Sequence, residues 1–124
     1  MRLAGYAALF DVADGASDTI LRGAFARTLA GRSEPLPLLW QHRSDRVIGR
    51  VEMLAEDKRG LRVIARVDGK AAELVASGSG LSFGYRVREA RHGGRRELID
   101  VDLVEVSVVA RPMQRLARVH AVEM

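Results

Sequence analysis

The segment Gly-Leu-Ser-Phe-Gly at residues 80–84 constrains this chain most, because it places Ser82 between two glycines that leave room for a substrate backbone. It matches G-x-S-x-G, the nucleophile elbow of α/β-hydrolases, which needs a strand before the serine and a helix after it. Here the order is reversed, since residues 70–76 have a helical composition and apolar residues alternate from Leu81 to Val87. The segment predicts a serine at the start of a strand in a small β domain. The alternative is a glycine-serine turn without chemistry, the commoner meaning of so short a motif.

Apolar runs and turn residues elsewhere predict about seven strands and two short helices. The other expected strands cover residues 3–10, 36–42, 47–54, 61–67, 98–110 and 118–122, and the helices cover residues 23–30, ended by Gly31 in the left-handed conformation, and 70–76. Short turns between neighbouring strands favour antiparallel pairing. We therefore expect a mainly β (α+β) fold, a small, mostly antiparallel β-barrel flanked by short helices, as a single domain over residues 1–124.

The composition excludes several classes of protein. There is no cysteine and the histidines lack the spacing of a metal site, so we expect no metal and no cofactor. No apolar stretch approaches the ~20 residues that span a bilayer, which predicts a cytoplasmic protein without a membrane partner. The net charge of +4 is spread as arginines along the whole chain and aromatic residues are few, so nucleic acid is not expected as the primary partner.

Three side chains have the chemistry of a nucleophile, a base and an acid. His42 ends an apolar strand, and its parity with Trp40 predicts that it lies on the inward face. Glu105 lies in an apolar run, where a carboxylate without a partner costs several kcal/mol to bury. That partner is either an arginine or His42. In the second case Ser82, His42 and Glu105 would form a catalytic triad, in which the carboxylate orients the imidazole that takes the serine proton.

At these residues the chain resembles the prohead (procapsid maturation) protease family of tailed bacteriophages and gene transfer agents, serine proteases similar in fold to herpesvirus assemblin. The resemblance runs nearly end to end, except that the family's pattern is absent at residues 112–115. It rests on six segments in the same order. They are Gly-Tyr-Ala-Ala-Leu-Phe-Asp at 5–11, Gly-Ala-Phe at 23–25, Pro-Leu-Leu-Trp-Gln-His at 37–42, Ile-Gly-Arg-Val at 48–51, Gly-Leu-Ser-Phe-Gly-Tyr at 80–85 and Asp-Leu-Val-Glu-Val-Ser-Val-Val at 102–109.

The resemblance implies a serine endopeptidase with His42 as general base, Ser82 as nucleophile and Glu105 as the third member. Such a protein would cleave the scaffold segment of the major capsid protein, and itself, within the assembling procapsid of the host cell. Its expected partners are the major capsid protein, the portal and further copies of the chain in a dimer or larger homo-oligomer. Two alternatives stay open: a non-catalytic capsid-assembly or scaffold module, and a basic nucleic-acid-binding β-barrel.

Overall fold

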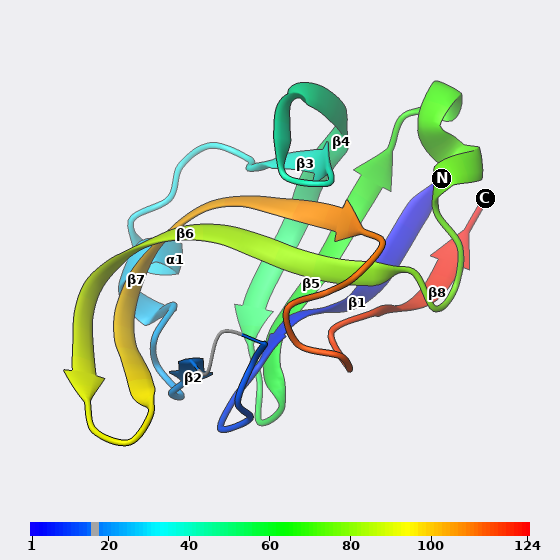
Figure 1. The fold of residues 1–124 in the computed structure, drawn as a ribbon. Coiled ribbons are helices and arrows are strands. Elements are labelled where there is room, and N and C mark those ends of the chain that lie inside the picture. Colours follow the sequence, from blue (N-terminus) through cyan, green and yellow to red (C-terminus); the bar gives the residue numbers. More distant parts are fainter. Residues whose placement is uncertain (16–17) are drawn as a thin grey trace.

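The computed structural model describes residues 1–15 and 18–124, and Figure 1 shows a curved sheet with few helices. Its elements in chain order are β1 (Arg2–Leu9), β2 (Asp18–Ile20), α1 (Ala26–Ala30), β3 (Pro37–Trp40), β4 (Arg43–Glu56), β5 (Gly60–Val67), the 3₁₀-helix η1 (Gly69–Leu74), β6 (Gly80–His92), β7 (Arg96–Val109) and β8 (Val119–Glu123). The predicted mainly β fold is confirmed. The count of about seven strands was one short of the eight described, because β2 has only three residues and no alternating pattern.

The strands form a single sheet in the order β2-β7-β3-β4-β5-β1-β8, with β6 on the other edge of β7. Most neighbours are antiparallel, as expected, but the sheet is mixed because β2 and β3 both run parallel to β7. The two parallel strands share one edge of β7, β2 pairing with residues 96–98 and β3 with residues 106–108. The long strand β7 thus joins the N-terminal part of the chain to the β6–β7 hairpin.

The ends of the sheet approach each other where β6 begins. Gly80 forms an isolated antiparallel bridge with Arg118. The N–H of Leu81 donates to the carbonyl of Ala117, and the N–H of Val119 donates to that of Ser79, both at 2.8 Å. These bonds join the first residues of β6 to the segment that leads into β8, so the sheet is nearly closed, as in a barrel.

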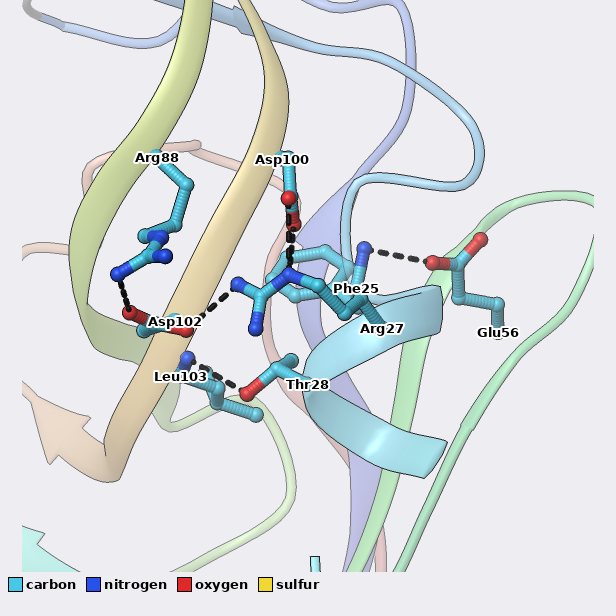
Figure 2. Close-up of polar contacts among 8 residues, drawn as sticks. All are labelled: Phe25, Arg27, Thr28, Glu56, Arg88, Asp100, Asp102 and Leu103. Carbon is cyan, nitrogen blue, oxygen red and sulfur yellow. Dashed lines mark hydrogen bonds and ion pairs between the residues drawn. The ribbon is translucent and has the colours of Figure 1, made fainter. Parts of the chain in front are cut away.

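The helix α1 covers the stretch of the β7 edge that lies between β2 and β3. The N–H of Val101 donates to the carbonyl of Ala24 at 3.1 Å. Figure 2 shows the next contact, in which Thr28 Oγ1 accepts a hydrogen bond from the N–H of Leu103 at 3.1 Å. Arg27 of the same helix lies between Asp100 and Asp102 and forms ion pairs with both. The carbonyl of Ala24, just before α1, and the hydroxyl of Thr28 therefore satisfy backbone N–H groups of β7 that have no strand beside them.

Both helices differ from the sequence prediction. The first begins at Ala26, because Gly23 has a φ of 89° and Glu56 accepts hydrogen bonds from the N–H groups of Gly23 and Phe25, which holds the preceding residues in a turn. Gly31 has a φ of −85°, so the predicted left-handed glycine is wrong. The second helix is a 3₁₀-helix. Neither of these described helices has the length and apolar composition needed to cross a membrane.

Gly60 is the glycine at which a side chain would make the shortest contact. A Cβ atom there would lie 1.9 Å from the backbone oxygen of Ala8 in β1. Because a strand would have to move, we expect Gly60→Ala to lower the free energy of unfolding by about 3 kcal/mol, as in the costlier overpacking substitutions. Gly69→Ala is the matched control, since a Cβ there meets nothing within 4 Å. Urea unfolding checks the prediction, and equal midpoints for the two variants would contradict it.

Candidate active site

Ser82 is the third residue of β6 and lies directly after η1 and its short connection, so the predicted order of helix, serine and strand is confirmed. The residue is only 8% exposed and pairs with Ser107 of β7. The neighbouring Phe83 packs edge to face on Phe25, with ring centroids 5.2 Å apart, which fixes this part of the strand on the core. Ser82 and His42 line the same small cavity, of about 80 Å³.

His42 lies in the two-residue turn that joins β3 to β4, so the prediction that it ends the inward face of a strand is wrong. Gln41 and His42 have φ values of 55° and 60°. This is the pattern of a type I′ hairpin turn, which usually contains asparagine and glycine. The turn is held on β7, because the N–H of Gln41 donates to the carbonyl of Val108 and its side-chain oxygen accepts from the N–H of Ala110, both at 2.9 Å. Backbone strain of this kind is often found at functional sites.

Glu105 is buried on β7, and its carboxylate lies against His42. The Oε2 and Oε1 atoms are 2.9 and 3.2 Å from His42 Nδ1. Ser107 Oγ donates to the same carboxylate, at 3.0 Å from Oε1. The predicted contact of Glu105 with His42 is therefore present, and no arginine of the described residues forms an ion pair with Glu105. The Glu105 hydrogen bond raises the pKa of His42 above its ordinary value, although partial burial opposes the shift.

The direction of these hydrogen bonds assigns the tautomer of the neutral imidazole. An ionised carboxylate only accepts hydrogen bonds, so Nδ1 of His42 carries the proton that it donates to Glu105. The other ring nitrogen, Nε2, is then unprotonated and can accept a proton. A buried carboxylate on one nitrogen and a free lone pair on the other is the arrangement by which a histidine acts as a general base.

The two glycines of the serine segment serve the protein's own packing, which differs from the expectation that they leave room for a substrate backbone. A Cβ atom on Gly84 would lie 2.8 Å from Cγ and Cδ of Glu105. One on Gly80 would lie 2.7 Å from the carbonyl oxygen of Val109 and 2.8 Å from Pro112. The absence of a Cβ atom on Gly84 thus leaves room for the Glu105 side chain, since the two residues are paired in the sheet.

We expect Gly84→Ala to displace the Glu105 carboxylate, and thereby to lower strongly the peptide cleavage that the family resemblance implies. A methyl group at this position cannot avoid the first side-chain carbons of Glu105, and a misplacement of about 1 Å at such a site can cost roughly 10²-fold in rate. Gly94→Ala in the exposed β6–β7 turn is the control, because its Cβ meets nothing within 4 Å. Steady-state peptide cleavage checks the prediction, and equal rates for both variants would contradict it.

His42 also lines a second hollow. It has a volume of about 470 Å³ and a largely apolar lining that includes Leu39, Val47, Val104 and Tyr85. Val47 is 55% and Val104 44% exposed, which is unusual for valine. The sequence alone does not show that these residues gather, because they come from four different strands and are brought together only by the sheet.

The remaining candidates do not contribute to this group. His92 is exposed at the end of β6, and His120 is exposed on β8, where its ring lies 5.5 Å from that of Tyr6. Among the described residues, neither histidine forms a hydrogen bond or ion pair with Ser82 or Glu105. Within residues 1–15 and 18–124, no three histidine, aspartate or glutamate side chains gather as metal ligands.

The chain thus falls in the class of small β proteins with a nearly closed, mostly antiparallel sheet and a serine-hydrolase-like group. In that group a histidine shares one cavity with a serine and bonds a buried carboxylate through Nδ1. Comparison with known families narrows this class. A family model described as caudovirus prohead serine protease matches residues 1–124, and the chain belongs to this family. The resemblance inferred from the six sequence segments is therefore confirmed.

Individual relatives support both the family and the fold. The prohead protease of Enterobacteria phage HK97 is 33% identical over 92 residues, which is 67% of this chain and 41% of the HK97 protein. The chain thus spans less than half the length of this curated relative. The structure of the KSHV protease in complex with a hexapeptide phosphonate inhibitor has a TM-score of 0.59 at 13% identity, covering 87% of this chain and 58% of the other. The varicella-zoster virus protease has a TM-score of 0.50 at 18% identity, covering 85% and 62%. These two likenesses show a shared fold.

Proposed function

We propose that this chain is a serine endopeptidase of phage-type capsid maturation, with Ser82 as nucleophile, His42 as general base and Glu105 as the carboxylate that orients the base. The observation that carries the proposal is the contact of the buried Glu105 with His42 Nδ1 beside a cavity that His42 shares with Ser82. Membership of the prohead serine protease family supports the same chemistry. The order His, Ser, acid along the chain separates it from α/β-hydrolases.

In the proposed mechanism, Ser82 Oγ attacks the carbonyl carbon of the scissile peptide bond while its proton moves to Nε2 of His42. Glu105 stabilises the imidazolium that forms. When the tetrahedral intermediate collapses, the C–N bond breaks and His42 returns the proton to the leaving amine. Water then attacks the acyl-enzyme, again with His42 as base, and releases the acid product and the free serine.

The proposed substrate is the scaffold segment of the major capsid protein, together with the protease itself, inside the procapsid of the host cell. The apolar hollow beside His42 supports a peptide substrate, because exposed Val47 and Val104 can pack on its side chains. Further partners under this proposal are the portal and other copies of the chain. A dimer is the form that we expect to be active.

The test is co-expression of the chain with the major capsid protein of the same phage or prophage, followed by mass spectrometry of both proteins. We expect the wild-type chain to release a defined scaffold fragment and the Ser82→Ala variant to release none. Equal amounts of this fragment with the wild-type chain and with Ser82→Ala would exclude Ser82 as the nucleophile. An uncut capsid protein that still co-assembles with the wild-type chain would favour the non-catalytic assembly module.

A further inference from the structure

The imidazole of His42 is held by few contacts for a proposed general base. Its side chain is 43% exposed, so packing does not lock its orientation. The residue also lies in a two-residue turn with positive φ at both positions, a conformation that a non-glycine residue keeps only where its surroundings enforce it. The hydrogen bonds of the turn must therefore determine where the ring lies.

Ser107 makes two of the hydrogen bonds that join this turn to Glu105. It is fully buried on β7, and its Oγ accepts a hydrogen bond from the backbone N–H of His42 at 3.1 Å. A backbone N–H can only donate and a carboxylate only accepts, so the single hydroxyl proton of Ser107 is directed at Glu105, with Oε1 3.0 Å away. One hydroxyl group thus connects the backbone of the histidine to the carboxylate that bonds its ring.

The register of the β6–β7 hairpin places Ser107 beside the serine as well. Ser82 and Ser107 are directly paired, and paired residues of antiparallel strands lie on the same face of the sheet. Glu105 lies two residues before Ser107 and therefore on this face too. A shift of Ser107 would therefore move both the His42 turn and the Glu105 carboxylate relative to Ser82.

We propose that Ser107 is a positioning residue that sets the imidazole of His42 and the carboxylate of Glu105 relative to each other and to Ser82. Its hydroxyl keeps Glu105 turned toward Nδ1 and anchors the strained turn that carries the ring. The proposal rests on the proposed function, because the geometry that Ser107 maintains is that of the proposed base and its carboxylate. Ser107 accepts a hydrogen bond from the His42 backbone and donates one to Glu105. Alanine at this position would remove both bonds at once.

A purely structural role would also predict a loss of stability, because removal of the hydroxyl takes a hydrogen-bond partner from the N–H of His42 and from the buried Glu105 carboxylate. The test therefore needs a readout that reports the ring itself. The ¹⁵N chemical shifts of the His42 ring distinguish the Nδ1–H from the Nε2–H tautomer, and the signals are assigned by their absence in His42→Ala. This readout needs no substrate.

We expect neutral His42 to be held as the Nδ1–H tautomer in the wild-type protein and to become a mixture with the Nε2–H form in Ser107→Ala. With a cleavable capsid peptide, kcat should fall roughly 10- to 100-fold while KM stays within about threefold, since the loss is one of geometry. Should Ser107→Ala fail to fold, Ser107→Cys replaces it, because the slightly larger thiol still fills the site of the hydroxyl but is a weak donor.

The matched control is Thr28→Val, which also removes a buried hydroxyl that accepts a backbone N–H, that of Leu103, without touching His42 or Glu105. It should shift the unfolding midpoint by a similar amount yet leave the tautomer unchanged and kcat within about threefold. A Ser107 variant with an unchanged tautomer and an unchanged kcat would overturn the proposal. If the wild-type chain cleaves no capsid protein, the proposed function fails, and the tautomer alone decides: its loss supports a positioning role and its retention overturns it.

Discussion

Ser82→Ala and His42→Ala should each lower peptide cleavage by several orders of magnitude while the protein stays folded, and the double variant should be no slower than either single one. The physical reason is that nucleophile and base act as a unit, so that removing one makes the other useless. Neither side chain fills the core. Ser82 loses only a hydroxyl group, and His42 is 43% exposed in a surface turn.

Single-turnover cleavage of a capsid-derived peptide by the four proteins measures this effect, with urea unfolding as the check on stability. Ser77→Ala provides the control for a serine outside the site, since that hydroxyl bonds only the exposed carbonyl of His120. Near-normal cleavage by Ser82→Ala or His42→Ala would remove that residue from the mechanism. A double variant whose loss equals the product of the single losses would show that the two residues act independently.

Glu105→Gln should lower the rate by roughly 10³- to 10⁴-fold with little change in stability, as expected for loss of a carboxylate that sets the tautomer of a catalytic histidine. The Ser107 hydroxyl would donate to the amide oxygen, so the amide NH₂ would face His42 Nδ1. Neutral His42 would then carry its proton on Nε2, so that Nε2 could not accept the proton of Ser82. Glu97→Gln, in an exposed ion pair with Arg91, is the matched control.

The pH dependence of cleavage gives an independent check of the Glu105 prediction. The Glu105 hydrogen bond raises the pKa of His42, and a general base must be neutral, so kcat/KM of the wild-type protein should rise through a pKa above the ordinary histidine value. Glu105→Gln should move this rise of kcat/KM to lower pH. The stabilisation from the same pair is fully present below the unfolded-state pKa and is lost as pH rises through the raised one. The same pH dependence of kcat/KM in both proteins would contradict the role assigned to Glu105.

The position of Glu105 could be predicted from the sequence because its environment repeats with the period of a strand. Its parity with Val101 and Leu103 placed it on the buried face, and all three are buried. The same argument failed for His42, since its position depends on a two-residue turn made of Gln and His, residues that give no turn signal. The turn conformation here is held by hydrogen bonds to residues such as Ser107, which lies 65 residues after His42 in the sequence.

The hydrogen bonds of Ser107 and the contact of Gly84 with Glu105 could not be predicted either, because both depend on which strands lie side by side. A serine in an apolar strand satisfies the strand pattern without revealing which polar groups it joins. The glycine at residue 84 fitted a known motif, and its true neighbour, Glu105, follows only from the register of the β6–β7 hairpin. The parallel pairing of β3 with β7 could not be read from the sequence, because short loops favour antiparallel pairing of strands that are neighbours in the chain and say nothing of strands far apart.

The parallel pairing of β3 with β7 has a consequence for how the site is assembled during folding. Ser82 and Glu105 belong to one hairpin, which can form by local contacts, whereas His42 is separated from Glu105 by 63 residues. Closing so long a loop is entropically costly and slows the formation of non-local strand pairs. A chain in which only the β6–β7 hairpin has formed therefore contains the serine and the carboxylate without the imidazole that bonds the carboxylate.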